Sequence, residues 1–456
     1  MLKKVHFVGI GGIGMSGIAE VLISLGIRVQ GSDLAHNDNT ARLEALGAKI
    51  YYRHESSQVG EADILVVSSD IKQDNPELQE ALRLGIPTIP RARMLAELMR
   101  LQQGIAIAGS HGKTTTTSLV AAILDQANLD PTVVIGGKVN HLGSNARHGK
   151  GKFLVAEADE SDGSFLLLLP NIAAVTNLDA EHLDFWKGGL PELQDAFVQF
   201  LNTLPFFGLA VLCADAQSLR EILPHIKRRV VTYGISEPAD FEAKEISHER
   251  FHTEFRLFKY SEDLGLVRLR LLGEHNVQNA LAAIAIADEL GISLDIMRDA
   301  LEAFAGVQRR FTQIGEKNGI LVIDDYGHHP VEIKAVLKTA QKTFAEHRVV
   351  VLFEPHRYTR TRDLMDAFVD AFENADYLVV SDIYPAREKP IEGISSTVLV
   401  DRIRETGHAQ VFYGGNLEQS TAMVVAAARP GDVIITLGAG AVTKSSVKIL
   451  ELLESV

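Results

Sequence analysis

The sequence contains one cysteine, Cys213, among its 456 residues. A single cysteine cannot form a disulfide within the chain, and it also excludes a zinc site built from several thiolates. No apolar stretch approaches the roughly 20 residues that a membrane-spanning helix needs, and the longest candidate, Phe165–Leu169, is far too short. The chain also has fewer basic than acidic residues. It contains 45 Lys and Arg and 59 Asp and Glu, which gives a formal net charge of −14.

These absences narrow the possible partners of the protein. The acidic balance argues against a nucleic acid or an anionic membrane surface as a partner, so any anionic ligand must be bound by local groups. The first residues lead directly into a strand-like segment, without the apolar core of a signal peptide. We therefore expect a cytoplasmic protein that binds small molecules, as a monomer or a weak homodimer.

The length and pattern of the chain predict an α/β protein of three domains, at residues 1–100, 101–310 and 311–456. Short apolar runs alternate with helix-like segments, which is typical of parallel sheets with right-handed crossovers. The alternation restarts at Ile105–Ala108 and again after Gly306–Gly319, a segment with little apolar pattern. The strands expected in the first and third domains are Val5–Val8, Arg28–Gln30, Lys49–Tyr52, Ile64–Val67, Gly319–Ile323, Val349–Phe353, Tyr377–Val380 and Val433–Leu437.

Near the end of the second domain, the alternation of strand-like and helix-like segments stops. Three strand-like runs, Glu242–Ile246, Thr253–Lys259 and Val267–Leu271, follow one another without room for a helix between them. Strands joined by short turns pair in opposite directions, so we predict an antiparallel flap. Two helices, Val277–Glu289 and Leu294–Ala303, are expected to follow it.

A first glycine loop follows the first expected strand and opens a helix. Gly9-Ile-Gly-Gly-Ile-Gly14 fits the spacing G-x-G-x-x-G, in which glycines let the backbone approach a diphosphate and the helix N-terminus supplies free N–H groups. The pattern alone is compatible with a structural turn, with NAD, or with another diphosphate-linked molecule such as a UDP-sugar. The candidate ligand contacts are Gly11, Gly12, Ile13, Gly14, Ser32, Asp33 and Ser69.

A second glycine loop follows strand Ile105–Ala108. It reads G-x-x-G-K-T, two residues shorter than the usual phosphate loop, and its members are Gly109, Ser110, His111, Gly112, Lys113, Thr114 and Thr115. Successive N–H groups can surround phosphate oxygens, while the lysine neutralises their charge and the first threonine can ligate Mg²⁺. A dehydrogenase has no use for a triphosphate site, so the two loops together favour ATP and a diphosphate-bearing second ligand.

Acidic residues follow the strand Phe153–Ala156. A Mg²⁺ ion at a phosphate loop requires hard oxygen ligands, and Glu157 is the first acid after the apolar run, so it is our candidate ligand. His182 follows the next strand and is a candidate for a second metal ion. A structural role for this histidine is equally compatible with the sequence alone.

Seven motifs, in order along nearly the whole chain, resemble those of the Mur ligases, the ATP-dependent amide-bond ligases of peptidoglycan precursor synthesis. They are His6-Phe-Val-Gly-Ile-Gly-Gly-Ile-Gly-Met-Ser-Gly17, Ala108-Gly-Ser-His-Gly-Lys-Thr-Thr-Thr-Thr-Ser118, Glu157-Ala-Asp-Glu-Ser-Asp162, Gly273-Glu-His-Asn-Val-Gln-Asn279, Arg309-Arg-Phe311, Asp324-Asp-Tyr-Gly-His-His-Pro330 and Pro355-His-Arg-Tyr-Thr-Arg-Thr-Arg362. The residues of these motifs are most similar to those of the alanine-adding enzymes of the family.

The resemblance implies a Rossmann-like UDP-binding domain, a central ATPase domain of P-loop type and a C-terminal Rossmann-like domain. The implied ligands are ATP, two Mg²⁺ ions, UDP-N-acetylmuramate and L-alanine. By carry-over, Thr114, Glu157 and His182 hold metal, and Lys113 binds phosphate. The same carry-over gives ATP contacts at Asn276, Asn279, Arg310 and Asp325, and an amino-acid site at Tyr326, Arg357 and Arg360. One group of the segment Asp324–His329 is expected to deprotonate the amine, and His329 is our candidate.

The chain departs from the family pattern in two places. The phosphate loop has Ser110 where threonine is commoner, and serine keeps the hydroxyl. Several family members carry a carbamylated lysine about fourteen residues after the histidine equivalent to His182, but the segment 193–197 here has no lysine. Two rivals stay open: a ligase of the same family that attaches a preformed tripeptide, and a UDP-sugar sensor that keeps the fold without turnover.

Overall fold

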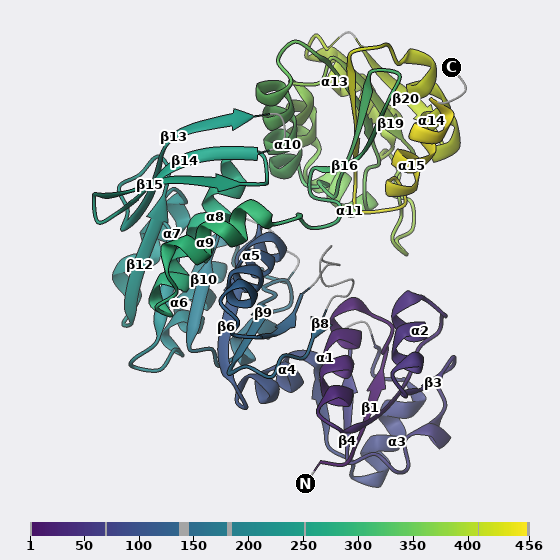
Figure 1. The fold of residues 1–456 in the computed structure, drawn as a ribbon. Coiled ribbons are helices and arrows are strands. Elements are labelled where there is room, and N and C mark those ends of the chain that lie inside the picture. The colour runs from purple at the N-terminus through teal and green to yellow at the C-terminus, as the bar shows by residue number, and fades with distance from the viewer. Residues whose placement is uncertain are drawn as a thin grey trace. The chain divides into compact units, whose positions relative to one another are not determined.

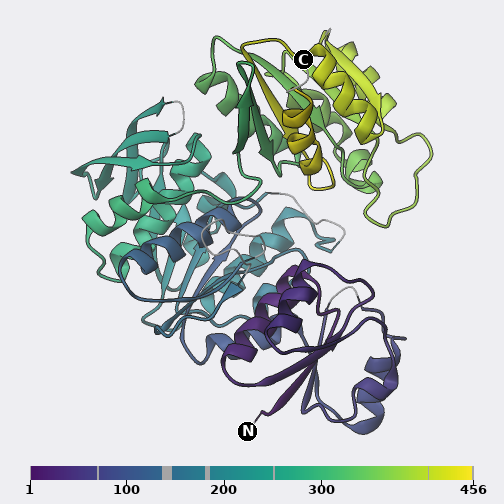
Figure 2. The same cartoon turned by 45° about the vertical axis from the view of Figure 1, so that its right-hand side comes forward.

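The structure is a computed structural model that describes residues 2–68, 71–135, 146–179, 185–249, 252–408 and 410–453. Three sheets follow one another along the chain, each layered with its own helices (Figures 1 and 2). The chain divides into two compact units. The first comprises Met1–Glu245, Phe255–Leu269 and Asn276–Ala305, and the second comprises Ile246–Glu254, Arg270–His275 and Gly306–Val456. The α/β class with three sheet-based parts is confirmed, whereas the boundaries at 100 and 310 stay predictions.

The first sheet is parallel, in the order β3-β2-β1-β4-β5. Its order reverses between β1 and its neighbours β2 and β4, so the loop after β1 opens at the switch point where α/β sheets bind ligands. The four predicted strands are present, and the fifth is a three-residue strand that ends in proline. The elements are β1 (Lys4–Val8), β2 (Arg28–Ser32), β3 (Lys49–Tyr51), β4 (Ile64–Val67), β5 (Thr88–Pro90), α1 (Ile13–Ser24), α2 (Asp38–Ala45), α3 (Pro76–Leu84) and α4 (Arg91–Met99).

The second sheet has ten strands among the described residues, in the order β15-β14-β13-β12-β11-β10-β6-β9-β7-β8. Strands β6, β9, β10, β11 and β12 are parallel, so their carboxyl ends share one edge. The elements are β6 (Gln103–Ala108), β7 (Thr132–Val134), β8 (Ala146–Arg147), β9 (Phe153–Glu157), β10 (Ile172–Val175), β11 (Leu209–Cys213), β12 (Arg229–Gly234), α5 (Lys113–Gln126), α6 (Leu190–Asn202), α7 (Gln217–Ile222), α8 (Glu274–Glu289) and α9 (Leu294–Ala303).

The predicted flap is present at the end of this sheet as β13 (Phe241–Glu249), β14 (His252–Lys259) and β15 (Glu262–Leu269). These strands are consecutive in the sheet and are joined by two-residue connections, which only antiparallel pairs permit. The third strand begins five residues before the predicted position at Val267. Its first two residues are polar and exposed, and its first buried residue is Val267, so its apolar pattern is visible only near the end.

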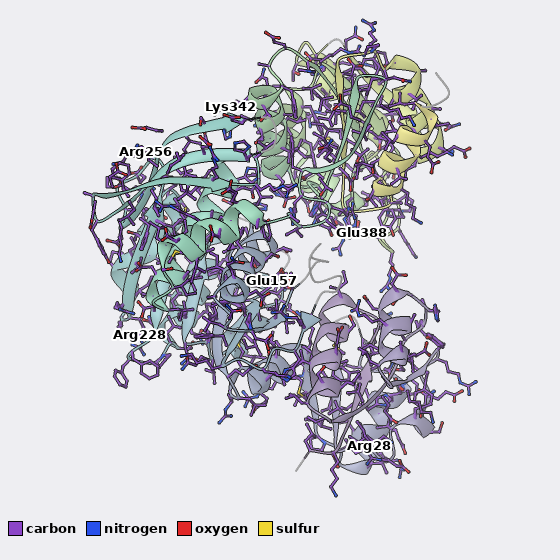
Figure 3. All side chains as sticks on the ribbon, viewed as in Figure 1. Arg28, Glu157, Arg228, Arg256, Lys342 and Glu388 are labelled. Atoms are coloured by element: carbon purple, nitrogen blue, oxygen red, sulfur yellow. The ribbon has the colours of Figure 1, made fainter. Side chains whose placement is uncertain are left out.

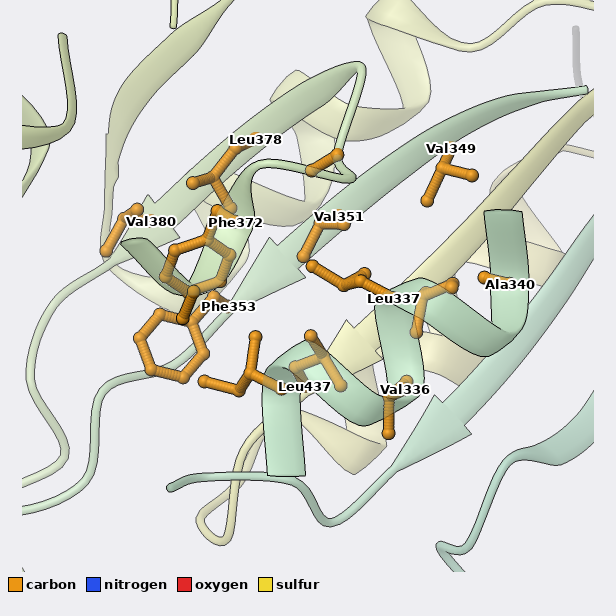
Figure 4. Close-up of a cluster of buried hydrophobic side chains, with 14 of the residues drawn as sticks. Val336, Leu337, Ala340, Val349, Val351, Phe353, Phe372, Leu378, Val380 and Leu437 are labelled. Carbon is orange, nitrogen blue, oxygen red and sulfur yellow. The ribbon is translucent and has the colours of Figure 1, made fainter. Parts of the chain in front are cut away.

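The third sheet has the order β16-β17-β21-β18-β19-β20 and is parallel except for the pair β16–β17. Alternate residues of its strands enter two separate cores. Val349, Val351 and Phe353 pack with α10 and α13, while Val350 and Leu352 pack with α14 and α15 on the opposite face (Figures 1 and 4). The elements are β16 (Thr312–Lys317), β17 (Ile320–Asp325), β18 (Arg348–Phe353), β19 (Tyr377–Ser381), β20 (Val411–Gly415), β21 (Asp432–Leu437), α10 (Pro330–Thr343), α11 (Tyr358–Asp363), α12 (Met365–Val369), α13 (Ser396–Glu405), α14 (Leu417–Ala427) and α15 (Thr443–Leu452).

A strand covered by helices on both faces reads as a continuous apolar run, as β18 does, and the two cores confirm a doubly wound third sheet. No helix within the described residues has the length and apolar character that crossing a membrane requires.

Candidate functional site

The second glycine loop connects β6 to α5 at the carboxyl edge of the central sheet. Gly112 has φ +80°, and a Cβ atom there would collide with Oδ1 of Asn279. Only glycine allows this backbone conformation and this close approach without strain. The amide of Asn279 in turn accepts a hydrogen bond from the hydroxyl of Thr116 at 3.1 Å and donates one to Asn276 at 3.1 Å. The predicted ATP contacts Asn276 and Asn279 therefore lie against the phosphate loop.

The ammonium of Lys113 lies inside this loop. It donates to the carbonyls of Gly109 and Ser110, and it pairs with the carboxylate of Glu160 at 2.8 and 3.0 Å. Burial by itself lowers the pKa of Lys113, but the charge of Glu160 raises it above the ordinary value, so the ammonium stays protonated. The loop thus offers a fixed positive charge surrounded by backbone groups, as a phosphate site requires.

The neighbouring strand β10 holds the other side of the loop. The side-chain oxygen of Asn177 accepts from the backbone N–H of His111 at 2.7 Å, and its amide donates to the carbonyl of the same residue. The hydroxyl of Thr176 also donates to carbonyls of the loop. Ser110 is fixed by its hydroxyl, which accepts from the N–H of Asp179 at 2.9 Å. The loop conformation is therefore set by two adjacent strands.

Glu157 ends β9, beside β6, and is labelled in Figure 3. Its charge contributes to the raised pKa of Lys113, and its strand pairs with β6, which leads into the phosphate loop. Thr114 and Glu157 supply the hard oxygen donors that Mg²⁺ prefers, so the donor chemistry fits the ion. Within the described part of the chain, no cluster of three or more His, Cys, Asp or Glu side chains could hold a metal by itself. His182, the predicted second ligand, lies outside the described residues.

The first glycine loop is fastened at the switch point of the first sheet. The N–H groups of Gly9 and Ile10 donate to the carbonyl of Ser32, and the N–H of Gly11 donates to the carboxylate of Asp33 at 2.8 Å. A Cβ atom on Gly11 would lie 2.8 Å from that carboxylate, so a side chain is excluded there. Gly12 caps α1 and Ile13 begins it, with about half of the Ile13 side chain exposed. Asp33 therefore both orders the loop and stands next to it.

The side chain of Ser32 is buried beneath this loop rather than beside a ligand. Its hydroxyl donates to Glu77 at 2.5 Å and contacts His54 at 2.9 Å, and Glu77 also contacts His6 at 3.1 Å. Ser32 thus supports the loop through a buried polar network, and the predicted ligand contact of its side chain is not what the geometry favours. Ser69 lies outside the described residues.

A cavity of about 400 Å³ adjoins the carboxyl ends of β4 and β5. Its lining includes Ser68 and Arg91 from the first domain and Asp162 and Ser164 from the acidic segment after β9. The guanidinium of Arg91 covers Gly14 and lies 3.6 Å from the carboxylate of Asp159. This arginine connects the first glycine loop to the acidic segment, and the sequence carried no signal for it.

In the second unit, the predicted residues Arg310, Asp325 and Tyr326 lie together at the carboxyl end of β17. The carboxylate of Asp325 accepts from the N–H groups of Phe311 and Gly327, both at 2.6 Å. Burial raises the pKa of Asp325 to about 6, although the charge of Arg310 and these two N–H groups oppose the rise. The guanidinium of Arg310 lies over the ring of Tyr326, 5.4 Å from its centroid.

Four rings form a ladder across the carboxyl ends of β17, β18 and β19. Tyr326 packs edge-on against His328, which packs edge-on against His356, which stacks on Tyr384 with centroids 5.5 Å apart. The pKa of each of the two histidines is lowered to about 4, chiefly by burial and in part by the charge of Arg360. Both imidazoles are therefore neutral at pH 7.

The predicted amino-acid contacts Arg357 and Arg360 flank this ladder. Arg360 contacts Nδ1 of His356 at 3.2 Å, and the N–H of Arg357 donates to the carbonyl of Tyr384. His329, the predicted catalytic histidine, is the N-cap of α10, where its Nδ1 accepts from the N–H of Val331 at 3.4 Å. The structure thus brings Tyr326, Arg357 and Arg360 to one edge of the sheet, with His328 inside the ladder and His329 at the helix start.

Three residues that contact the candidate site were not predicted from the sequence, although the sequence contains a signal for each of them. Glu160 belongs to the same acidic run as Glu157. Asn177 follows strand β10 directly, and position after a parallel strand was the reason for choosing other candidates. Tyr384 follows β19 in the same way. In each case the signal was a polar or aromatic residue just after a parallel strand, which is where such sheets bind ligands.

Three family models match the chain. They are described as the Mur ligase family catalytic domain at residues 4–103, the Mur ligase middle domain at 107–287, and the Mur ligase glutamate ligase domain at 309–440.

Full-length relatives are also found. The chain is 54% identical to a UDP-N-acetylmuramate–L-alanine ligase of Geobacter sp. (strain M21), over 96% of this chain and 95% of the relative. It is 52% identical to the enzyme of that name from Geobacter sulfurreducens, over 99% and 98%. Among solved structures, the UDP-N-acetylmuramate–alanine ligase of Thermotoga maritima matches with a TM-score of 0.84 and 30% identity, over 100% of both chains. A murein peptide ligase of Psychrobacter arcticus matches with a TM-score of 0.70 and 26% identity, over 100% and 99%.

Proposed function

The chain belongs to the Mur ligase family, and from this premise we propose that it joins L-alanine to UDP-N-acetylmuramate, using ATP, in peptidoglycan precursor synthesis. The observation that carries the proposal is the presence of two distinct glycine loops in one chain. One surrounds the buried ammonium of Lys113, and the other opens at the switch point of the first sheet. The first suits a triphosphate and the second suits a diphosphate-linked sugar.

The chemistry explains why both loops are needed. A carboxylate is a poor electrophile, because its negative charge repels nucleophiles and it has no leaving group. Transfer of the γ-phosphoryl group of ATP to the lactyl carboxylate of the muramyl group gives an acyl phosphate and ADP. The neutral amine of alanine then attacks the acyl carbon, and the tetrahedral intermediate releases phosphate and leaves the amide.

Two anions must meet in the first step, so the site must supply positive charge. Lys113 offers an ammonium that its pairing with Glu160 keeps protonated, and a phosphate oxygen competes with that carboxylate for it. Thr114 and Glu157 would hold Mg²⁺, which when bound neutralises phosphate charge. Asn276 and Asn279 keep the loop in the conformation that the phosphates require. Contacts of Arg310 and Asp325 with ATP stay predictions.

The amino acid binds at the ring ladder of the third sheet. Guanidinium groups bind a carboxylate through paired hydrogen bonds, and Arg357 and Arg360 both lie at this edge. His329 stays the predicted acceptor for the amine proton, and His328, which is neutral at pH 7, is a second acceptor at this edge. Nδ1 of His328 lies 3.1 Å from the carbonyl of Tyr326, to which Nδ1–H donates in the neutral tautomer, so Nε2 is left as an acceptor.

The remaining expectations follow from this activity. The ligands are ATP, Mg²⁺, UDP-N-acetylmuramate and L-alanine, and the reaction takes place in the cytoplasm. The protein acts as a monomer or a weak homodimer, without nucleic acid or membrane. The cavity beside Arg91 has room for part of the sugar substrate.

The test is phosphate release from ATP and Mg²⁺ in the presence of UDP-N-acetylmuramate, with L-alanine, other amino acids or the tripeptide added in turn. Release that requires both the sugar nucleotide and L-alanine is the expected result. Release with the tripeptide alone would move the protein to the recycling branch, and no release with any combination would favour the sensor. We expect Lys113→Ala to abolish phosphate release while binding of UDP-N-acetylmuramate, measured by calorimetry, is retained.

A further inference from the structure

The backbone turns sharply between β18 and α11, where the chain carries Arg357. This residue has φ +72°, in the left-handed region that non-glycine residues rarely adopt. Such a conformation persists only where surrounding contacts enforce it, and it is concentrated at sites where direction matters. The orientation of the Arg357 side chain therefore depends on whatever holds this turn.

The turn is held by the loop that follows β19. The N–H of Tyr384 donates to the carbonyl of Pro355, and the N–H of Arg357 donates to the carbonyl of Tyr384, both at 2.8 Å. Further along, the carboxylate of Glu388 accepts from the N–H of Thr359 at 3.0 Å and from its hydroxyl at 2.6 Å. We call these contacts between Pro355–Thr359 and Tyr384–Glu388 the clasp.

In the clasp, Tyr384 contributes backbone hydrogen bonds, whereas Glu388 accepts hydrogen bonds through its side-chain carboxylate. Partial burial raises the pKa of Glu388, but the hydrogen bonds from Thr359 and the charge of Arg357 lower it below the ordinary value, so the carboxylate is ionised at neutral pH. One charged group thus binds two donors of the turn, both from Thr359.

The loop that carries Glu388 is itself strained. Ala386 has φ +44° and Arg387 has φ +74°, so two consecutive non-glycine residues occupy the left-handed region immediately before the carboxylate. Two strained segments therefore face each other, and the clasp is what links them.

We propose that Glu388 is a positioning residue of the amino-acid site, which holds the Arg357 turn in the conformation that presents the guanidinium to the carboxylate of the amino-acid substrate. This inference rests on the proposed function. It states that Glu388, which is not part of the ring ladder, contributes to the affinity of the protein for the amino acid. Glu388 acts through Thr359 and Arg357. A small displacement of a group that binds substrate can cost up to a hundredfold in rate, so a loosened turn is expected to have a measurable effect.

The experiment compares steady-state kinetics of the full-length protein with those of Glu388→Ala and Glu388→Gln. We expect Glu388→Ala to raise the KM for L-alanine about tenfold or more, the range of a lost charge-assisted contact. The kcat at saturating L-alanine, and the KM values for ATP and UDP-N-acetylmuramate, are expected to stay within about twofold, because the clasp touches only the amino-acid edge. Glu388→Gln keeps one acceptor oxygen and should give an intermediate KM.

Two further variants separate positioning from folding. Glu392→Ala, at an exposed position on the same loop, is the matched control and should leave all three KM values unchanged. Thr359→Val removes the hydroxyl donor, so it should raise the KM for L-alanine, and combining it with Glu388→Ala should add little, since both act through the same contact.

An unchanged KM for L-alanine in Glu388→Ala would overturn the inference, as would a rise of all three KM values together. Both outcomes presuppose an active wild-type protein. If the wild type releases no phosphate with L-alanine, the proposed function fails first. The failure of the function and the failure of the inference are therefore distinguished by the wild-type control.

Discussion

The ion pair between Lys113 and Glu160 shows how a single residue prepares the phosphate site. Only 1% of the Glu160 side chain and 18% of the Lys113 side chain are exposed, so the two charges meet away from water. Such a pair adds little net stability, but breaking it by removing one partner is costly, because a buried charge is left behind. The same carboxylate competes with any phosphate oxygen for the lysine.

Glu160→Gln is therefore expected to have opposite effects on the ligand-free and the nucleotide-bound protein. Without nucleotide, the loss of the pair should lower stability by roughly 3 kcal/mol, as for other buried pairs. With ATP, the phosphates replace the missing charge, so ATP should bind more tightly. Thermal denaturation with and without ATP measures both effects, and the rise in Tm caused by ATP should be larger in the variant.

Asp162→Asn is the matched control for this prediction. Asp162 belongs to the same acidic segment, but its carboxylate accepts from the N–H of Ser164. Its replacement should leave the effect of ATP on Tm unaltered. An equal rise in Tm for wild type and Glu160→Gln would contradict the competition between carboxylate and phosphate.

At the scale of elements, the strand–loop–helix units around the two glycine loops could be predicted, because buried parallel strands have continuous apolar runs. Strand β16 could not, since it is an antiparallel edge strand whose residues are all partly or fully exposed, and it lies in the segment expected to be a boundary. Strand β5 has three residues and ends in proline, which leaves no pattern to detect. Short edge strands gain their stability from partners rather than from their own sequence.

The candidate site shows the same division. Residues inside one loop, such as Gly112 and Lys113, were predictable because their roles follow from local backbone geometry. The ring ladder was not, because Tyr326, His356 and Tyr384 come from three strand ends that are joined only by the sheet order. The pairing of Lys113 with Glu160 was not predictable either, because it depends on the path of the chain after β9.

The loop between β6 and α5 gives a prediction about glycine. Gly112→Ala should weaken ATP binding at least tenfold and destabilise the protein by roughly 1–3 kcal/mol, because the new Cβ atom meets both an unfavourable φ and the side chain of Asn279. ATP titration followed by calorimetry and thermal denaturation would measure the two effects.

Gly85→Ala separates strain from collision. Gly85 has φ +68° as the C-cap of α3, but no atom lies within 4 Å of the position that a Cβ atom would occupy there. This variant should lose roughly 1 kcal/mol from backbone strain alone and should bind ATP normally. Equal effects of the two substitutions on ATP binding would show that the contact with Asn279 is unimportant.

At the scale of the whole molecule, the three histidines whose pKa values are lowered most belong to the same unit. Burial lowers the pKa of His275, His328 and His356 to about 4, and all three belong to the second unit. Between pH 6.5 and pH 4 the unfolded chain binds protons at these positions while the folded chain does not. Their contribution to stability is therefore present above pH 6.5 and is lost as the pH falls toward 4.

Asp325 acts in the opposite direction. Its pKa is raised to about 6 in the folded state, so its contribution is present below its unfolded value near 3.8 and is lost as the pH rises through 6. When the pH falls, protonation of one carboxyl group therefore stabilises the folded protein, and protonation of three imidazoles destabilises it. Each shift is worth roughly 2 kcal/mol after allowance for partial exposure, so the balance is a net loss.

We therefore expect the second unit to open before the first when the pH is lowered from 7.5 to 5. Hydrogen exchange followed by mass spectrometry, corrected for the intrinsic effect of pH, would measure this for each sheet separately. Amides of β17 and β18 should lose protection at pH 5, while those of β1 and β4 keep it. His356→Gln removes one of the titrating rings and should shift the loss in the second unit to lower pH. Equal loss of protection in the two units, or no shift in the variant, would mean that the buried imidazoles do not control the acid response.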